Sequence, residues 1–61
     1  LDGLDHAILN SIKQNTYITY EQLVDLTGKS LSTIHRRIQK LSQIYIKRIG
    51  SDKTGYWKII A

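Results

Sequence analysis

The segment from residue 31 to residue 41 places its aliphatic side chains at a helical spacing. Leucine and isoleucine recur there at intervals of three, four and three positions, at Leu31, Ile34, Ile38 and Leu41. These intervals put the four side chains on one face of a helix. Ser30 is a suitable N-cap because its hydroxyl can accept a hydrogen bond from a free N–H of the first turn. Gly28 can take a positive φ and end a preceding helix. We therefore predict a helix that is entered through a tight turn and needs an apolar partner on one side.

The opposite face of this predicted helix is polar and basic. No carboxylate occurs from Lys29 to Ser51, whereas a solvated helix of ordinary composition mixes charges of both signs. The candidate contact residues on this face and its flanks are Ser32, Thr33, His35, Arg36, Arg37, Gln39 and Lys40. Two interpretations stay open, a solvated basic face and a surface for a polyanionic partner.

Two more helices are predicted earlier in the chain. The first spans about residues 1–15, with Asp2 as N-cap and Asn15 ending it in the left-handed region. The second opens at Thr19, where Thr19 and Gln22 match a capping box, and it stops at Gly28. Residues 17–19 could be a brief strand or only a connection. A helix, a short glycine-bearing turn and a second helix form a helix-turn-helix arrangement.

After residue 41 the spacing of the hydrophobic residues changes from helical to alternating, which predicts a β-hairpin. Ile44 and Ile46 alternate with Tyr45 and Lys47, while Ile49 breaks the alternation and suggests a bulge or an early twist near Arg48. Residues 50–55 have turn composition, and residues 56–60 form the second predicted strand. The basic residues expected on the hairpin are Lys47, Arg48, Lys53 and Lys58. Trp57 has two interpretations, a core anchor that closes the hairpin onto the first and third helices, or a residue of the nucleic-acid surface.

The length and composition set further limits. With 61 residues and no cysteine, the chain can form one domain whose core must hold by packing alone. A net charge of +4 favours a polyanionic partner. No apolar run approaches the roughly 18 residues of a membrane span. The chain begins with Leu1 and contains no methionine, so we expect one domain over residues 1–61 taken from a longer protein.

Several function classes lack the residues they require. Without cysteine there is no disulfide frame, thiolate zinc site or cysteine nucleophile. Residues 28–30 (Gly-Lys-Ser) are similar to the end of a phosphate-binding loop, but Leu23 stands where the first glycine of that loop is required. His6 and His35 lie on different predicted helices, with no carboxylate pair beside them. We therefore expect no enzyme, no metal site and no cofactor.

Three segments together resemble a winged helix-turn-helix domain, and the resemblance covers essentially the whole chain. They are Ile18-Thr19, residues 32–34 (Ser-Thr-Ile) with Arg36, and the run from Ile46 to Trp57. The last run is the more specific part. It resembles the C-terminal winged-helix domain of bacterial transcriptional regulators related to RecG-type ATP-dependent DNA helicases, which carry a Schlafen/AlbA-type N-terminal domain.

The chain departs from that pattern at three points and has a second, weaker resemblance. Lys29 replaces an aliphatic turn residue, Leu31 replaces a polar contact residue, and the usual glycine before the wing is missing. Residues 55–61 resemble the end of Z-form nucleic-acid-binding domains, which are also winged helices. In that family an asparagine and a tyrosine stand at the positions of His35 and Gln39, and the wing carries prolines that this chain lacks.

The first resemblance implies an α+β fold in the order helix, strand, helix, helix, strand, strand. It implies duplex DNA binding as an accessory domain of a transcriptional regulator, with helix three in the major groove. Arg36 and Gln39 are the expected contacts to base edges. His35 could contact a phosphate or remain solvated, and Lys53 at the wing tip would reach the backbone or the minor groove. The expected phosphate contacts on helix three are Ser32, Thr33, Arg37 and Lys40.

The expected partners are double-stranded DNA and the remainder of the full-length chain, with a homo-oligomer as an open option and no membrane. The expected location is the cytoplasm, at the nucleoid. The rival hypothesis is a protein-interaction or dimerisation module, because fold alone does not determine function. Leu31 and Tyr45 are the candidate partner contacts of that hypothesis.

Overall fold

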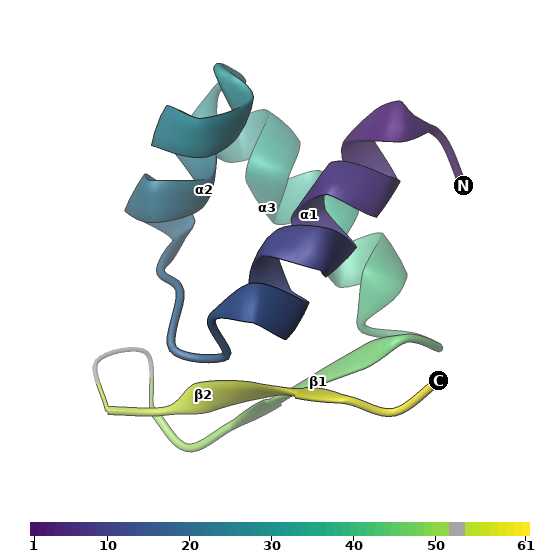
Figure 1. Cartoon of the computed structure of the whole chain (residues 1–61), viewed down its shortest axis with the longest axis vertical. Helices are drawn as coiled ribbons and strands as arrows, with labels where there is room; N and C mark the ends of the chain where they lie inside the picture. Colours follow the sequence, from purple (N-terminus) through teal and green to yellow (C-terminus); the bar gives the residue numbers. More distant parts are fainter. Residues whose placement is uncertain (52–53) are drawn as a thin grey trace.

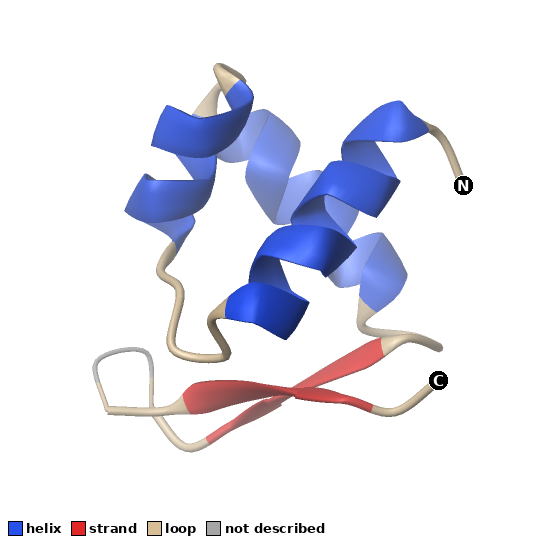
Figure 2. Cartoon of the chain, in the orientation of Figure 1, coloured by secondary structure: helices blue, strands red, loops and turns tan. Residues whose placement is uncertain are grey.

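The computed structural model describes residues 1–51 and 54–61 and shows three helices followed by a β-hairpin (Figures 1 and 2). The elements in chain order are α1 (Gly3–Gln14), α2 (Tyr20–Thr27), α3 (Leu31–Leu41), β1 (Ile46–Ile49) and β2 (Tyr56–Ile59). The helices lie together on one side of the hairpin, whose two strands pair antiparallel. This arrangement confirms the predicted α+β class. Lys53, the predicted wing-tip contact, lies outside the described residues.

The helices begin at the N-caps that the sequence predicts, Asp2, Thr19 and Ser30. In α2 both bonds of the capping box form. The Gln22 N–H donates to the Thr19 hydroxyl at 3.1 Å, and the Thr19 N–H donates to the Gln22 side-chain oxygen at 2.9 Å. In α1 the same reciprocal bonds join Asp2 and Asp5. These caps satisfy N–H groups that have no partner within the helix.

The ends of α1 and α2 differ. Gly28 ends α2 with φ +71°, as predicted, and its N–H donates to the Val24 carbonyl at 2.9 Å. Asn15 was expected in the left-handed region, and this expectation is wrong, because its φ of −146° and ψ of 97° are extended. Its side-chain oxygen instead accepts a hydrogen bond from the Tyr17 N–H at 3.1 Å. The Asn15 side chain therefore organises the turn that follows α1.

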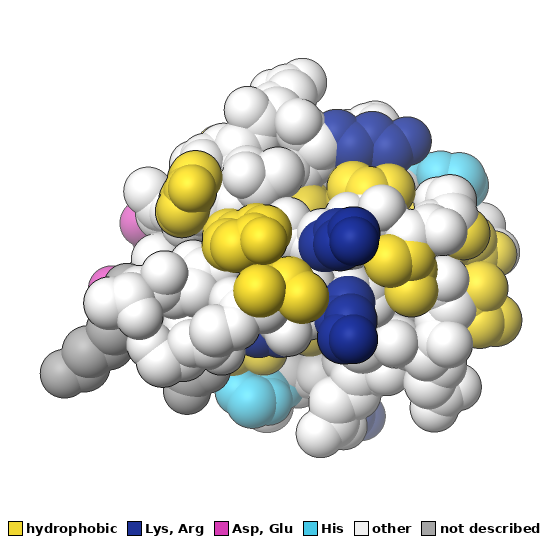
Figure 3. Space-filling view, turned by 90° about the horizontal axis from the view of Figure 1, so that it is seen from below, with side chains coloured by type: hydrophobic (Ala, Val, Ile, Leu, Met, Phe, Trp, Pro, Cys, Tyr) yellow, Lys and Arg dark blue, Asp and Glu magenta, His cyan; other side chains and the backbone are white. Residues whose placement is uncertain are grey.

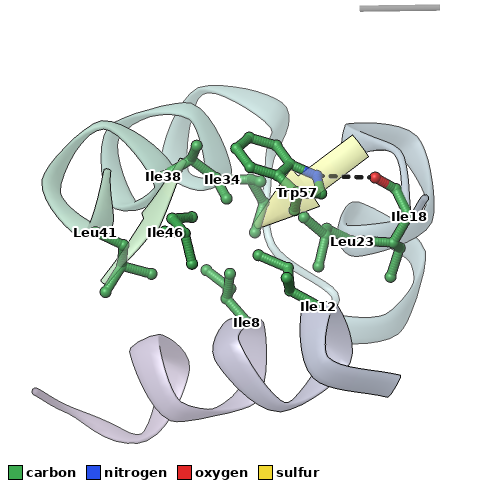
Figure 4. Packing of buried hydrophobic residues seen from close by; sticks show 9 residues of the cluster. All are labelled: Ile8, Ile12, Ile18, Leu23, Ile34, Ile38, Leu41, Ile46 and Trp57. Carbon is green, nitrogen blue, oxygen red and sulfur yellow. Dashed lines mark hydrogen bonds between the residues drawn. The ribbon is translucent and has the colours of Figure 1, made fainter. Parts of the chain in front are cut away.

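The core lies between the helices and the inner face of the hairpin (Figure 4). Its buried members are Ile8, Ile12, Ile18, Leu23, Ile34, Ile38, Leu41, Ile46 and Trp57. Leu31 was predicted to belong to the apolar face of α3, but 51% of it is exposed. The expectation fails because the core reaches α3 only from Ile34 onward, and Leu31 is the first residue of the helix.

Trp57 takes the core position that was predicted for it. Only 3% of the residue is exposed, and its indole N–H donates to the Ile18 carbonyl oxygen at 3.0 Å (Figure 4). Its backbone N–H donates to the Thr16 carbonyl at 2.7 Å. Trp57 therefore ties the hairpin to the connection between α1 and α2, and the alternative that placed it at the nucleic-acid surface is wrong.

The strand predicted at residues 17–19 is not formed. Residues 16 and 17 make a turn and Thr19 already serves as the N-cap of α2, so little extended chain is left to pair. The backbone bond from Trp57 to Thr16 and the indole bond to Ile18 stand in its place. The element order is therefore helix, helix, helix, strand, strand in the described residues.

The hairpin is more regular than the sequence suggested. Ile46 pairs with Ile59 and Ile49 pairs with Tyr56, and the pairs between them follow one to one, so the bulge expected near Arg48 is absent from this ladder. The first strand begins at Ile46 rather than at Ile44, because the N–H groups of residues 44 and 45 donate to the Leu41 carbonyl and prolong the end of α3.

The turn of the hairpin requires glycine at position 55. A Cβ atom there would lie 2.3 Å from the carbonyl oxygens of both Ile49 and Ser51. The Gly55 N–H donates to the Ser51 carbonyl at 2.7 Å, and the hydroxyls of Ser51 and Thr54 are 2.7 Å apart. These contacts bring the two strands together at the base of the wing.

Candidate nucleic-acid interface

One face of α3 is exposed, and two of its side chains have no polar partner within the described part of the chain. Ser32, His35, Arg36 and Gln39 are all exposed, and their spacing places them on adjoining rows of the helix. Arg36 and Gln39 make no side-chain hydrogen bond or ion pair with any described residue. The guanidinium of Arg36 and the amide of Gln39 are therefore available to an external ligand.

A group of hydroxyls lies at the N-terminus of α3. The Ser30 hydroxyl lies 3.3 Å from that of Ser32 and 3.0 Å from that of Thr33, which is half-buried. Lys29 is exposed in the turn just before, and the first turn of α3 carries no acid. Free N–H groups and the helix dipole make such an end favourable for anions.

His35 is positioned by a row of aromatic rings. Its imidazole lies against Tyr20, with ring centroids 4.6 Å apart. Tyr20 meets Trp57 edge-on at 6.0 Å, and the Arg48 guanidinium lies 4.9 Å from the Trp57 ring centroid. The row links the exposed face of α3 to the hairpin. The sequence did not reveal it, because Tyr20 belongs to α2 and no local spacing joins it to His35.

Arg37 and Lys40 form ion pairs with acidic residues at the start of α1. Both were predicted to contact phosphates, yet they bind the two acids at the start of α1. Arg37 bonds Asp2 and reaches Asp5 at 3.2 Å, and the Lys40 ammonium lies 3.0 Å from Asp5. Asp5 is fully buried, and its carboxylate is satisfied by these two cations and by the Asp2 N–H. These bonds join the first turn of α1 to the second half of α3.

The basic residues of the hairpin have distinct surroundings. Lys47 and Lys58 are exposed and stand directly opposite each other on the two strands. Arg48 is half-buried, stacks on Trp57 and donates to the Ser51 carbonyl at 3.1 Å. Only the two lysines are therefore fully presented to solvent among the described cations of the hairpin.

Residues 1–44 match the model of a protein family described as winged helix-turn-helix DNA-binding. The chain belongs to this family. The matched span contains α1, α2 and α3, and the hairpin that follows has the place of the wing. A comparison with curated proteins and a comparison with solved structures each gave no match. The family assignment makes DNA the partner class of this winged helix-turn-helix domain.

The acidic cluster of the domain has perturbed pKa values. Hydrogen bonding by Arg37 lowers the pKa of Asp2 from 3.8 to about 2, with a smaller contribution from the Asp5 N–H. Burial alone would raise the pKa of Asp5, but the hydrogen bonds from Lys40 and Arg37 outweigh burial and lower it. The bond to Asp2 in turn raises the pKa of Arg37. Asp2, Asp5 and Arg37 are therefore charged at neutral pH.

The cluster was absent from the sequence predictions, although the sequence carries a signal for it. Asp2 and Asp5 are three residues apart on α1, and Arg37 and Lys40 are three residues apart on α3. Equal spacing on two helices lets two opposite pairs meet. Asp2 stands four residues before His6, a spacing that favours a surface pair between them. The Asp2 carboxylate instead binds Arg37.

Within the described residues, no three histidines, cysteines or carboxylates lie close enough together to hold a metal ion. No described helix has the length and apolar character that a membrane crossing requires.

Proposed function

We propose that this winged helix-turn-helix domain binds duplex DNA with the exposed face of α3 in the major groove. The proposal rests on one observation, that side chains of this face are exposed to solvent and two of them lack partners within the described part of the domain. Ser32, Arg36 and Gln39 are exposed, and Arg36 and Gln39 have no partner in the described residues. Arg and Gln side chains are suited to base edges in the major groove, and Ser32 and Thr33 to phosphates.

The remaining predicted contacts divide into two groups. His35, stacked on Tyr20, would reach the backbone from a fixed position, and Lys53 would act from the wing. Arg37 and Lys40 would have to leave Asp5 or share it in order to contact a phosphate. We propose that these two residues mainly hold α3 against α1 and so set the angle of the helix in the groove.

We further propose a setting for the domain. The resemblance of the wing to bacterial RecG-related regulators supports an accessory role within a longer transcriptional regulator that acts in the cytoplasm at the nucleoid. The remainder of that chain would supply any effector response, and a second copy could supply a second half-site. The flanking sequence of the full-length protein tests this setting directly.

A salt titration tests DNA binding and counts the cations involved. The slope of log affinity against log salt is about −0.9 for each phosphate neutralised. If four basic side chains contact phosphates, Arg37 and Lys40 among them, the slope would be near −3.6. Affinity would then fall roughly a hundredfold between about 50 and 200 mM salt. If Asp2 and Asp5 retain these two cations, two contacts remain, the slope is about −1.8, and the loss is roughly tenfold.

The titration uses a labelled duplex, with chemical-shift mapping on the isotope-labelled protein. We expect the smaller slope, with shifts on Ser32, Thr33, His35, Arg36 and Gln39. Lys13→Ala on α1 is a matched control that removes one exposed charge away from α3. No binding at about 50 mM salt, or shifts confined to α1, would defeat the proposal and favour the protein-interaction hypothesis.

A further inference from the structure

The hairpin has a second face that the helices leave uncovered. Figure 1 shows all the helices on one side of the two strands. Side chains alternate between the two faces of a strand. Trp57 points into the core, so Tyr56 and Lys58 point outward, and Lys47 lies opposite Lys58 on the same outer side. We call the surface formed by Tyr17, Lys47, Tyr56, Lys58 and Ile60 the outer hairpin face.

The two lysines at the centre of this face repel each other electrostatically. Lys47 and Lys58 are a cross-strand pair, and like charges directly opposite each other destabilise a sheet. Neither forms an ion pair with a described residue. The chain carries no Asp or Glu from residue 26 to residue 51 or from residue 54 to its end. An external carboxylate between the two ammonium groups would remove this repulsion.

Exposed apolar side chains flank the lysine pair. Tyr17 is 68% exposed and contacts Tyr56, which is 39% exposed, with ring centroids 5.9 Å apart. Ile60, two residues beyond Lys58 along the chain, is 50% exposed. Figure 3, which looks onto the hairpin, shows basic side chains side by side with hydrophobic ones around them. Apolar patches that adjoin charged groups are typical of interaction surfaces.

We propose that the outer hairpin face binds an acidic, amphipathic segment of a protein partner. Carboxylates of that segment would lie between Lys47 and Lys58, and its apolar side chains would cover Tyr17, Tyr56 and Ile60. Along β2 and the residue that follows it, the order at every second residue is aromatic, cation, aliphatic. This order matches an extended segment with the complementary order apolar, acid, apolar.

Two other occupants fit the face less well. A second copy bound about a two-fold axis would bring the same lysine pair against itself. A nucleic-acid strand would satisfy the lysines, but apart from groups such as the thymine methyl it offers little aliphatic surface for Ile60. The Tyr17 and Tyr56 rings, inclined at 48°, also lean on each other instead of presenting two parallel stacking surfaces. The proposed face shares no residue with the DNA-contacting face of α3, so both ligands could bind together.

The test is a chemical-shift titration of the 61-residue chain with a short synthetic peptide that carries leucine, glutamate and leucine at every second position, with neutral polar residues between them. A peptide with glutamine in place of glutamate is the matched control. We expect shifts on Lys47, Tyr56, Lys58 and Ile60, and binding about tenfold weaker for the glutamine peptide, since two exposed charge contacts are lost. Equal binding of both peptides, or shifts on α3, would overturn the proposal.

Variants separate this face from the DNA face. The double substitution Lys47→Gln and Lys58→Gln should abolish the preference for the glutamate peptide while duplex-induced shifts on α3 persist. Thermal melting checks the fold, which should be retained because a repulsive pair is removed. Retained preference in the double variant would contradict the proposal. So would concentration-dependent self-association through these residues, or tighter binding of oligothymidine than of the glutamate peptide.

Discussion

The two sides of α3 both carry basic residues in the sequence but have different surroundings in the structure. On one side, Arg36 and Gln39 are exposed and without partners in the described residues. On the other side, Arg37 and Lys40 bind Asp5, which is fully buried at the start of α1. A basic residue in the sequence is therefore not equivalent to a basic surface. Of two adjacent residues of one helix, Arg36 is left exposed and Arg37 is paired within the fold.

The largest expected effect comes from Trp57, which anchors the hairpin in the core and contacts the ring that stacks on His35. Trp57→Ala removes the core anchor of the hairpin and the ring behind Tyr20 and His35. Truncation of a core tryptophan costs about 3–5 kcal/mol of unfolding free energy. In a domain of this size, that loss can abolish folding.

Circular dichroism melting measures the effect of Trp57→Ala. Tyr17→Ala is the matched control, because it removes an exposed aromatic ring from the neighbourhood of the same hairpin. A Trp57→Ala variant that melts within a few degrees of the parent would show that the indole is not a core anchor.

A smaller loss of stability is expected when the buried carboxylate of Asp5 is neutralised. Asp5→Asn keeps the shape of the side chain but removes the charge that holds Arg37 and Lys40. We expect a loss of about 1–3 kcal/mol in unfolding free energy, below the cost of breaking a fully buried pair, because both cations can turn to solvent. Denaturant unfolding measures it, with the exposed Asp25→Asn as control. Equal losses in the two variants would contradict the structural role of Asp5.

The same cluster predicts a dependence of stability on pH. The pKa of Asp2 falls from 3.8 to about 2 on folding, and that of Asp5 is also lowered. A carboxyl whose pKa is lower in the folded state stabilises the fold above its unfolded pKa. That contribution is lost as pH falls through the folded value. Stability should therefore decline from about pH 4 towards pH 2.

Melting temperatures recorded across this acid range check the prediction. Asp5→Asn should flatten part of the decline, because asparagine does not titrate, whereas Glu21→Gln on the surface of α2 should leave the curve unchanged. An identical decline in the parent and in Asp5→Asn would show that the cluster does not govern the acid response.

The local features of the fold follow from the sequence, and the contacts between helices do not. The caps at Asp2, Thr19 and Ser30 and the left-handed Gly28 depend on neighbouring residues, so residue type and spacing sufficed to predict them. The burial of Asp5 depends on which end of α1 meets α3. Short-range spacing carries no direct information about that meeting.

The candidate site was likewise predictable from the sequence only in part. The exposure of Ser32, Arg36 and Gln39 followed from helical periodicity, because they oppose the buried aliphatic row. The exposure of Leu31 did not, since periodicity assigns a face but does not say how far the core extends along it. The internal partners of Arg37 and Lys40 likewise required the packed structure.

The central claim, that the two sides of α3 have separate tasks, is tested by one paired measurement. Arg36→Ala and Arg37→Ala are compared in a thermal melt and in a titration with a duplex selected from a random pool by the parent domain. We predict that Arg36→Ala weakens duplex binding by about 1–3 kcal/mol and leaves the melting temperature unchanged. Arg37→Ala should lower the melting temperature while the folded variant retains most of its affinity. Equal losses of affinity in both variants, with no difference in melting temperature, would contradict the account.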